Sequence, residues 1–197
     1  MNITYLPIGD SYTIGEGVLE EKNFPNQLVN RLTNKGISIE LLGNEAVTGF
    51  TTQDVINGQL KLIPSLQPNF CTLLIGVNDW VQEVSAQYFE KRLIEIIQTI
   101  IKQVKGKLLL LTIPDFSVSA TGNKYGKGRN ITEGITQFNT IIKKQAAAFE
   151  LSVIDIFPLS QKQTDNSYFA PDQLHPSGKA YQEWVEKMLP TVATLVH

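Results

Sequence analysis

Short apolar runs alternate along the whole chain with longer segments in which apolar residues recur at helical spacing. The short runs are rich in Leu, Ile and Val and barely alternate in polarity, which is typical of parallel strands covered on both faces. They predict five strands, which span residues 3–8, 38–42, 70–75, 107–113 and 152–156.

The longer segments predict four amphipathic helices. In the second of them, seven apolar residues recur at helical spacing, Ile101 among them, and Gly106 is a typical C-terminal stop. The first has Pro25 near its start and Gly36 past its end, as expected for a helix. The predicted helices span residues 23–35, 85–105, 132–150 and the segment from 177 onward.

Strands that alternate with helices indicate a parallel sheet with helices on both faces. We therefore expect a single-domain α/β fold over residues 1–197, a flavodoxin-like three-layer α/β/α sandwich. Its five-stranded parallel sheet should have the order 2-1-3-4-5, with the Rossmann order as the alternative. No linker, internal repeat or block of charge divides the chain.

Composition narrows the choice of partners. Lys plus Arg number 17 and Asp plus Glu number 19, so the formal charge of −2 gives no reason to expect nucleic acid or an anionic membrane. The single cysteine, Cys71, allows no intramolecular disulfide and lies in an apolar run, so we expect a buried thiol. No signal peptide and no membrane-spanning stretch is visible, which predicts a cytoplasmic protein without a stable membrane anchor. Oligomeric state stays open.

Four short segments carry candidate chemistry, and each lies just past a strand or just before a helix. Ligands of open parallel sheets bind outside the carboxyl ends of the strands, so these distant segments can share one site. The first is Gly9-Asp10-Ser11-Tyr12, directly after the first strand. A serine hydroxyl at this turn can act as a nucleophile if a base activates it. Asp and Ser are also common turn and cap residues.

A single histidine is available as that base. The chain has two, and His197 is the last residue, which leaves His175. Asp172 precedes it by three residues in a segment bounded by Pro171 and Pro176, so a tight turn can bring the carboxylate to the imidazole. The alternative is a surface turn that leads into the last helix.

Two further segments offer donors for a developing oxyanion. Asn78, within Gly76-Val77-Asn78-Asp79, follows the third strand, and its side-chain amide can donate to negative charge. Gly49 lies between the second strand and the next helix, where its N–H is free to donate and substrate can approach closely. Taken alone, the segment with Asn78 is more typical of a turn or helix cap, and the segment with Gly49 is more typical of a helix-entry loop.

Together the four segments resemble the sequence blocks of the SGNH (GDSL-type) hydrolase family, at family-like spacing over most of the chain. In size the chain is similar to compact bacterial lysophospholipase/arylesterase/thioesterase members. One departure is Tyr12, where the eponymous motif has Leu. The block residues, in chain order, are Ser11, Gly49, Asn78, and Asp172 with His175.

The resemblance implies a flavodoxin-like fold and a Ser-His-Asp triad of Ser11, His175 and Asp172. It also implies an oxyanion hole formed by the N–H groups of Ser11 and Gly49 and by the Asn78 side chain. We therefore expect a serine hydrolase that cleaves small-molecule carboxylic esters through an acyl-enzyme, without cofactor or metal.

Three alternatives to this activity remain. A non-catalytic binding or interaction protein is disfavoured, because it would have no reason to keep all five site residues together. An acyltransferase would use the same residues with an acceptor alcohol in place of water. A flavin- or nucleotide-binding module is suggested by fold analogy alone, because the first turn lacks the Gly-x-Gly-x-x-Gly spacing and a Walker lysine.

The sequence offers candidate residues for substrate recognition in two places. Four large side chains flank the catalytic segments and are candidates for the substrate pocket: Phe50, Trp80, Tyr168 and Leu174. The alternative is that they belong to the rim or to the core. Residues 115–130 form a long stretch rich in Gly, Ser and Lys that follows the fourth strand. This stretch is either a lid or recognition segment, with Val118 and Tyr125 as its apolar anchors, or a mobile surface connection.

Overall fold

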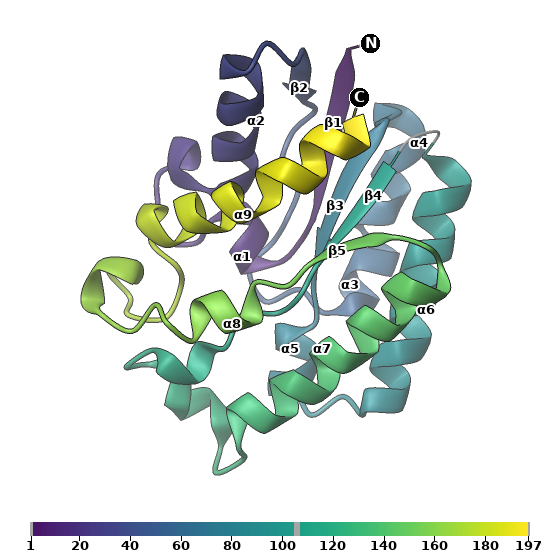
Figure 1. Cartoon of the computed structure of the whole chain (residues 1–197). Helices are drawn as coiled ribbons and strands as arrows, with labels where there is room; N and C mark the ends of the chain where they lie inside the picture. Colours follow the sequence, from purple (N-terminus) through teal and green to yellow (C-terminus); the bar gives the residue numbers. More distant parts are fainter. Residues whose placement is uncertain (1, 105–106, 197) are drawn as a thin grey trace.

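The computed structural model describes residues 2–104 and 107–196 and contains one five-stranded sheet (Figure 1). All neighbouring strands are parallel, and their order is β2-β1-β3-β4-β5, so the predicted order is confirmed. Each predicted strand overlaps an observed one and is trimmed or extended by one or two residues. The strands are β1 (Ile3–Gly9), β2 (Ile39–Leu41), β3 (Phe70–Leu74), β4 (Lys107–Leu111) and β5 (Ser152–Ile154).

Helices cover both faces of this sheet. Helices α2 and α9 pack together on one face, and α6, α7 and the short α3 (Thr52–Asn57) lie on the other (Figure 1). The four long helices match the predicted ones to within two residues at each end. They are α2 (Phe24–Asn34), α6 (Ala86–Gln103), α7 (Ile131–Ala148) and α9 (Gly178–Val196). The predicted stop at Gly106 lies outside the described residues, as does His197.

Short helices of four to six residues, too short to show a period in the sequence, occupy the connections. Three of them begin at the carboxyl ends of strands or in the loops beside those ends and carry the chemistry discussed below. The short helices are α1 (Ser11–Ile14), α3 (Thr52–Asn57), α4 (Ile63–Leu66), α5 (Val77–Val81) and α8 (Phe157–Ser160).

The sheet strands and the inner faces of the helices form one apolar core. Cys71 is fully buried in β3, as expected, and burial raises the pKa of its thiol to about 12. Ile101, one of the seven apolar residues at helical spacing in α6, is 44% exposed. It follows the buried Ile100 by one position, about 100° further around α6, and lines an open hollow with Leu108 and Phe149 instead of the closed core.

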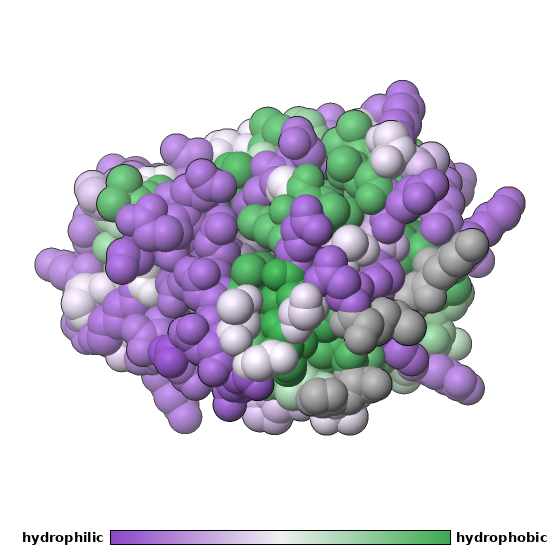
Figure 2. Space-filling view, turned by 90° about the horizontal axis from the view of Figure 1, so that it is seen from above, coloured by the Kyte–Doolittle hydropathy of each residue, from purple (hydrophilic) through white to green (hydrophobic). Residues whose placement is uncertain are grey.

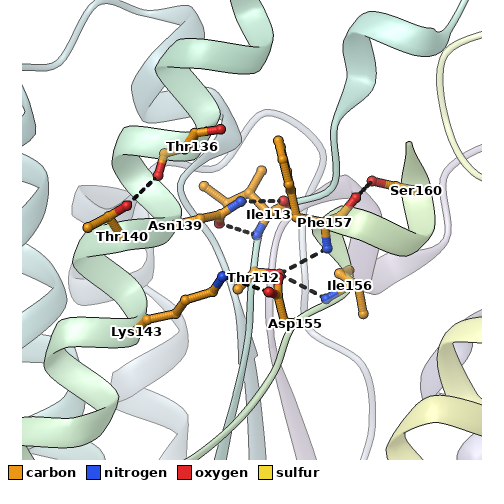
Figure 3. Close-up of polar contacts among 10 residues, drawn as sticks. All are labelled: Thr112, Ile113, Thr136, Asn139, Thr140, Lys143, Asp155, Ile156, Phe157 and Ser160. Carbon is orange, nitrogen blue, oxygen red and sulfur yellow. Dashed lines mark hydrogen bonds and ion pairs between the residues drawn. The ribbon is translucent and has the colours of Figure 1, made fainter. Parts of the chain in front are cut away.

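Side chains fasten the carboxyl ends of β4 and β5 to α7 (Figure 3). The Asn139 amide of α7 both donates to the Ile113 carbonyl and accepts from the Ile113 N–H, at 2.8 and 2.7 Å. The Thr112 hydroxyl donates to Asp155 at 3.0 Å and accepts from the Ile156 N–H at 2.9 Å. The chain that leaves β4 therefore starts from a fixed point.

The opposite end of the sheet, where the strands begin, is seen from above in Figure 2. Apolar side chains gather in the middle of this face among hydrophilic ones. A hollow of about 250 Å³ on this side has a mixed lining, which includes the apolar Ile101, Leu108 and Phe149 and the polar Lys107, Glu150 and Ser152. No helix among the described residues combines the length and the apolar character needed to cross a bilayer.

Candidate active site

The turn after β1 presents Ser11 as the first residue of α1. The preceding Asp10 caps this helix, and its Oδ1 accepts from the Tyr12 N–H at 3.1 Å. The turn is tight: a Cβ at Gly9 would lie 2.2 Å from Thr13 Oγ1. At this first helical position the Ser11 N–H has no partner within the helix.

Asp172 and His175 form a hydrogen-bonded pair at the turn before α9. Asp172 Oδ2 lies 2.6 Å from His175 Nδ1, and Oδ1 accepts from the backbone N–H groups of Leu174 and His175 at 2.9 and 3.0 Å. Burial raises the pKa of the Asp172 carboxyl, but these hydrogen bonds outweigh it and hold the pKa below its ordinary value. Asp172 therefore stays ionised beside the imidazole and leaves Nε2 as the ring nitrogen free to act.

Ser11 and His175 line the same hollow, which has a volume of about 220 Å³. Gly49 and Asn78 line it too, so the fold brings four of the five block residues together, with Asp172 behind the imidazole. Within the part of the chain that the structure describes, no hydrogen bond joins the serine hydroxyl to the imidazole. Such catalytic contacts are often long before substrate binds.

Gly49 and Asn78 present N–H groups at the edge of this hollow. Gly49 has φ +87°, and a Cβ there would meet no atom within 4 Å, so backbone conformation rather than space favours glycine. The Asn78 Nδ2 donates to the Phe50 carbonyl at 2.9 Å. That bond uses one of two amide hydrogens, and the second remains for a ligand.

Asp79 joins the segments that carry these two donors. Its carboxylate is fully buried and accepts from the Thr52 N–H at 2.8 Å and from the Thr52 hydroxyl at 2.5 Å. Arg92 lies 3.8 Å away. Burial raises the pKa of Asp79 above its ordinary value, although both partners act in the opposite direction. The start of α3, three residues after Gly49, is thereby fixed against α5.

Asp10 is buried next to the nucleophile with one oxygen unused. Its Oδ2, together with Thr13 Oγ1 and Tyr181 OH, lacks a hydrogen-bond partner among the described residues. Burial raises the pKa of Asp10 to about 8, with a smaller contribution from the Asp79 charge. The carboxyl is therefore neutral over most of the range below pH 8.

The four candidates for the substrate pocket take different places. Leu174 lines the hollow, Tyr168 lines a smaller neighbouring one, and Phe50 contributes its carbonyl to Asn78. Trp80 is buried away from the hollow, with its ring against Arg129 and Phe116. The reason is geometric: two positions along α5 from Asn78 correspond to about 200° around the helix.

Sequence reasoning did not single out Phe116, which lines the hollow together with Tyr125 and Val81. The available signal was its position, two residues after Pro114 at the carboxyl end of the fourth strand. Among residues 2–104 and 107–196, no cluster of three His, Cys, Asp or Glu side chains is placed to hold a metal ion.

Solved structures of similar fold cover almost the whole chain. TesA is 22% identical, with a TM-score of 0.76 over 98% of this chain and 99% of that one. A member of the lipolytic protein G-D-S-L family from Veillonella parvula is 19% identical, with a TM-score of 0.78 over 98% and 99%. A family 3 carbohydrate esterase from Clostridium thermocellum is 20% identical, with a TM-score of 0.76 over the full length of both chains.

Sequence comparison gives a family assignment. No curated protein is similar enough in sequence to match the chain. The sequence profile of the GDSL-like lipase/acylhydrolase family matches residues 8–183, a range that includes every block residue named above. As the four sequence blocks predicted, the chain belongs to the GDSL-like lipase/acylhydrolase family of ester hydrolases.

Proposed function

We propose that this chain is a serine esterase, a single hydrolase domain over its whole length, in which Ser11 is the nucleophile and His175 the general base. The observation that carries the proposal is the 2.6 Å contact between Asp172 and His175 beside the hollow that Ser11 also lines. An ionised Asp172 fixes the tautomer of the ring and stabilises the imidazolium that forms during proton transfer.

The reaction runs in two matching steps. His175 Nε2 takes the proton of the Ser11 hydroxyl as Oγ attacks the ester carbonyl, and the tetrahedral oxyanion accepts from the N–H groups of Ser11 and Gly49 and from the Asn78 amide. The intermediate collapses to an acyl-serine while the imidazolium gives its proton to the leaving alcohol. Water then attacks the acyl-serine by the same route and releases the acid.

The hollow limits what part of a substrate can enter. Its volume of about 220 Å³ is below the roughly 300–1,000 Å³ of pockets that enclose a drug-sized ligand. We infer that it takes one end of a small ester and leaves the other end at the surface. The carbohydrate esterase among the similar structures makes acylated sugars a substrate class to test.

Replacement of the nucleophile gives the first test. Ser11→Ala should abolish hydrolysis of p-nitrophenyl acetate and leave the melting temperature within a few degrees of wild type, because only one small hydroxyl is removed. A fluorinated phosphonate should label wild type with one group per chain and leave Ser11→Ala unlabelled. Equal labelling of both proteins would refute the role of Ser11.

The oxyanion donor gives the second test. Asn78→Ala should lower kcat by roughly 10²–10³-fold, because the amide is aimed at charge that develops only in the transition state. KM should change little. A loss confined to KM or to thermal stability would show that Asn78 is a structural residue. Analysis of products with an added acceptor alcohol would separate hydrolysis from acyl transfer.

A further inference from the structure

The long connection between β4 and α7 crosses the active-site end of the sheet as an ordered segment, which we call the clasp (residues 116–129). It contains two 3₁₀ helices, η3 (Phe116–Val118) and η4 (Gly122–Gly126). The residue just before the clasp, Asp115, is fixed, because its N–H donates to the Ser160 hydroxyl at 2.7 Å. Asp115 Oδ1 in turn accepts from the Ser117 N–H at 3.0 Å.

The middle of the clasp is fastened to the turn that carries the catalytic pair. Thr121 donates twice to this turn, from its N–H to the Gln173 carbonyl at 3.2 Å and from its hydroxyl to the Asp172 carbonyl at 3.1 Å. Both acceptors belong to the backbone between Asp172 and His175. A displacement of the clasp would therefore break contacts with the turn that holds the imidazole.

The far end of the clasp is fastened to α5, the helix that carries Asn78. The Arg129 guanidinium donates to the carbonyls of Trp80 and Val81 at 2.8 and 3.2 Å, which are among the last carbonyls of that helix. It also donates to the Gly126 carbonyl at 3.1 Å and stacks 4.0 Å from the centre of the Trp80 ring. A cation is favoured at a helix C-terminus, and the planar fork meets acceptors that a lysine cannot bridge.

Between these fastenings the clasp contributes two rings to the hollow beside Ser11. Tyr125 stands at its rim with 42% of the residue exposed, and Phe116 is buried at 4%. Phe116 also lines the smaller neighbouring hollow, which continues towards Val118 and Tyr168. Its ring is therefore part of the wall between the space next to the nucleophile and the space behind it.

We propose that the clasp is the acyl wall of this enzyme: Phe116 restricts the hollow to short acyl chains, and Arg129 is the positioning residue that holds the wall against α5. This proposal rests on the proposed esterase function. The fastenings at both ends argue against the mobile surface connection that composition alone left open. The substrate class that follows is an ester of a short fatty acid, with its apolar chain against Phe116, Val81 and Leu174.

The role of Phe116 as part of this wall is tested by Phe116→Ala. The matched control is Phe149→Ala, which lines the hollow at the opposite end of the sheet. We expect Phe116→Ala to raise kcat/KM for octanoyl relative to acetyl p-nitrophenyl esters, by about fourfold for each methylene that enters the freed space. The rate of Ser11 labelling by a small phosphonate should stay within threefold of wild type. An unchanged chain-length profile with intact labelling would overturn the proposal that Phe116 limits the acyl chain. If the alanine variant does not fold, Phe116→Leu provides the same comparison. Wild type that is neither labelled nor active would instead refute the esterase function.

The positioning role of Arg129 is tested by Arg129→Lys, with Arg31→Lys, in a partly exposed ion pair, as its control. Arg31 pairs with Glu186 at 2.8 Å on the surface between α2 and α9, away from the hollow. We expect Arg129→Lys to lower kcat severalfold and to flatten the chain-length preference, and Arg31→Lys to change neither. In an Asn78→Ala background the kcat effect of Arg129→Lys should shrink. Arg129 acts on kcat through the position of α5, which carries the Asn78 amide, and this background lacks that amide. A lower melting temperature with unchanged kcat and chain-length profile would reduce Arg129 to a structural residue.

Discussion

The buried Asp10 beside the nucleophile predicts an unusual dependence of stability on pH. An aspartate has a pKa near 3.9 in the unfolded chain, whereas burial raises the pKa of Asp10 to about 8 in the folded one. Between these values the folded protein holds a proton that the unfolded chain has released. This group therefore stabilises the fold most below pH 4, and its contribution is lost as pH rises towards 8.

Asp10→Asn isolates this contribution, because the amide keeps the shape and the capping oxygen but does not titrate. Linkage gives about 1.4 kcal/mol per pH unit for one proton, so from pH 5 to pH 7 wild type should lose roughly 3 kcal/mol relative to Asp10→Asn. For a chain of this size that corresponds to about 6–12 °C in the difference between the melting temperatures.

Thermal melts followed by circular dichroism at pH 5, 6 and 7 measure this difference. Thr13→Val is the matched control, because it removes another buried, unpartnered oxygen that carries no charge. Its offset from wild type should be the same at every pH. A constant offset between Asp10→Asn and wild type across this range would refute the reasoning and show that Asp10 has the same protonation state in the folded and unfolded chains.

Three substitutions test two residues of the site, Asp79 and Gly49, and the packing of Gly134 in α7 against Trp80. Asp79→Asn keeps an acceptor for the Thr52 N–H but replaces the carboxylate oxygen that accepts from the Thr52 hydroxyl and removes the charge that faces Arg92. It should lower kcat severalfold with little change in KM, as steady-state kinetics would show; a change in melting temperature alone would contradict a positioning role. Gly49→Ala forces a left-handed φ on a side chain and should cost about 1–2 kcal/mol in denaturant unfolding, although the space is open. Gly134→Ala should cost about 1–3 kcal/mol or more, because its Cβ would lie 1.9 Å from Trp80 Nε1; wild-type stability would mean that α7 shifts freely.

The parts of this fold that were predictable from sequence are those with a periodic pattern. Buried strands are continuous apolar runs, and α6 and α9 carry apolar residues at helical spacing, so the five strands and the long helices followed. The order of the strands required a choice between the flavodoxin-like and the Rossmann arrangement. His175 could be chosen because the chain has so few histidines. Its partner Asp172 could be chosen because it precedes His175 by three positions, a spacing at which one turn brings the two side chains together.

The parts that sequence could not give depend on how distant segments cross. Arg129 is an ordinary cation in a polar stretch, and only the folded chain brings it to the end of α5. Phe116 lines the hollow because the chain turns back over the sheet after β4. Trp80 looked like a pocket residue because it follows Asn78 closely, but the helical twist of α5 points its ring the other way.

The two outermost strands, β2 and β5, have only three residues each. An edge strand offers unpaired backbone groups that a second chain can join, and short edges leave little room for such pairing. Glu40, in the middle of β2, is exposed and adds a charge to that edge. An open sheet of this kind is therefore protected against edge-to-edge aggregation by the brevity of its margins, and lengthening β2 with β-branched residues is the change that would remove this protection.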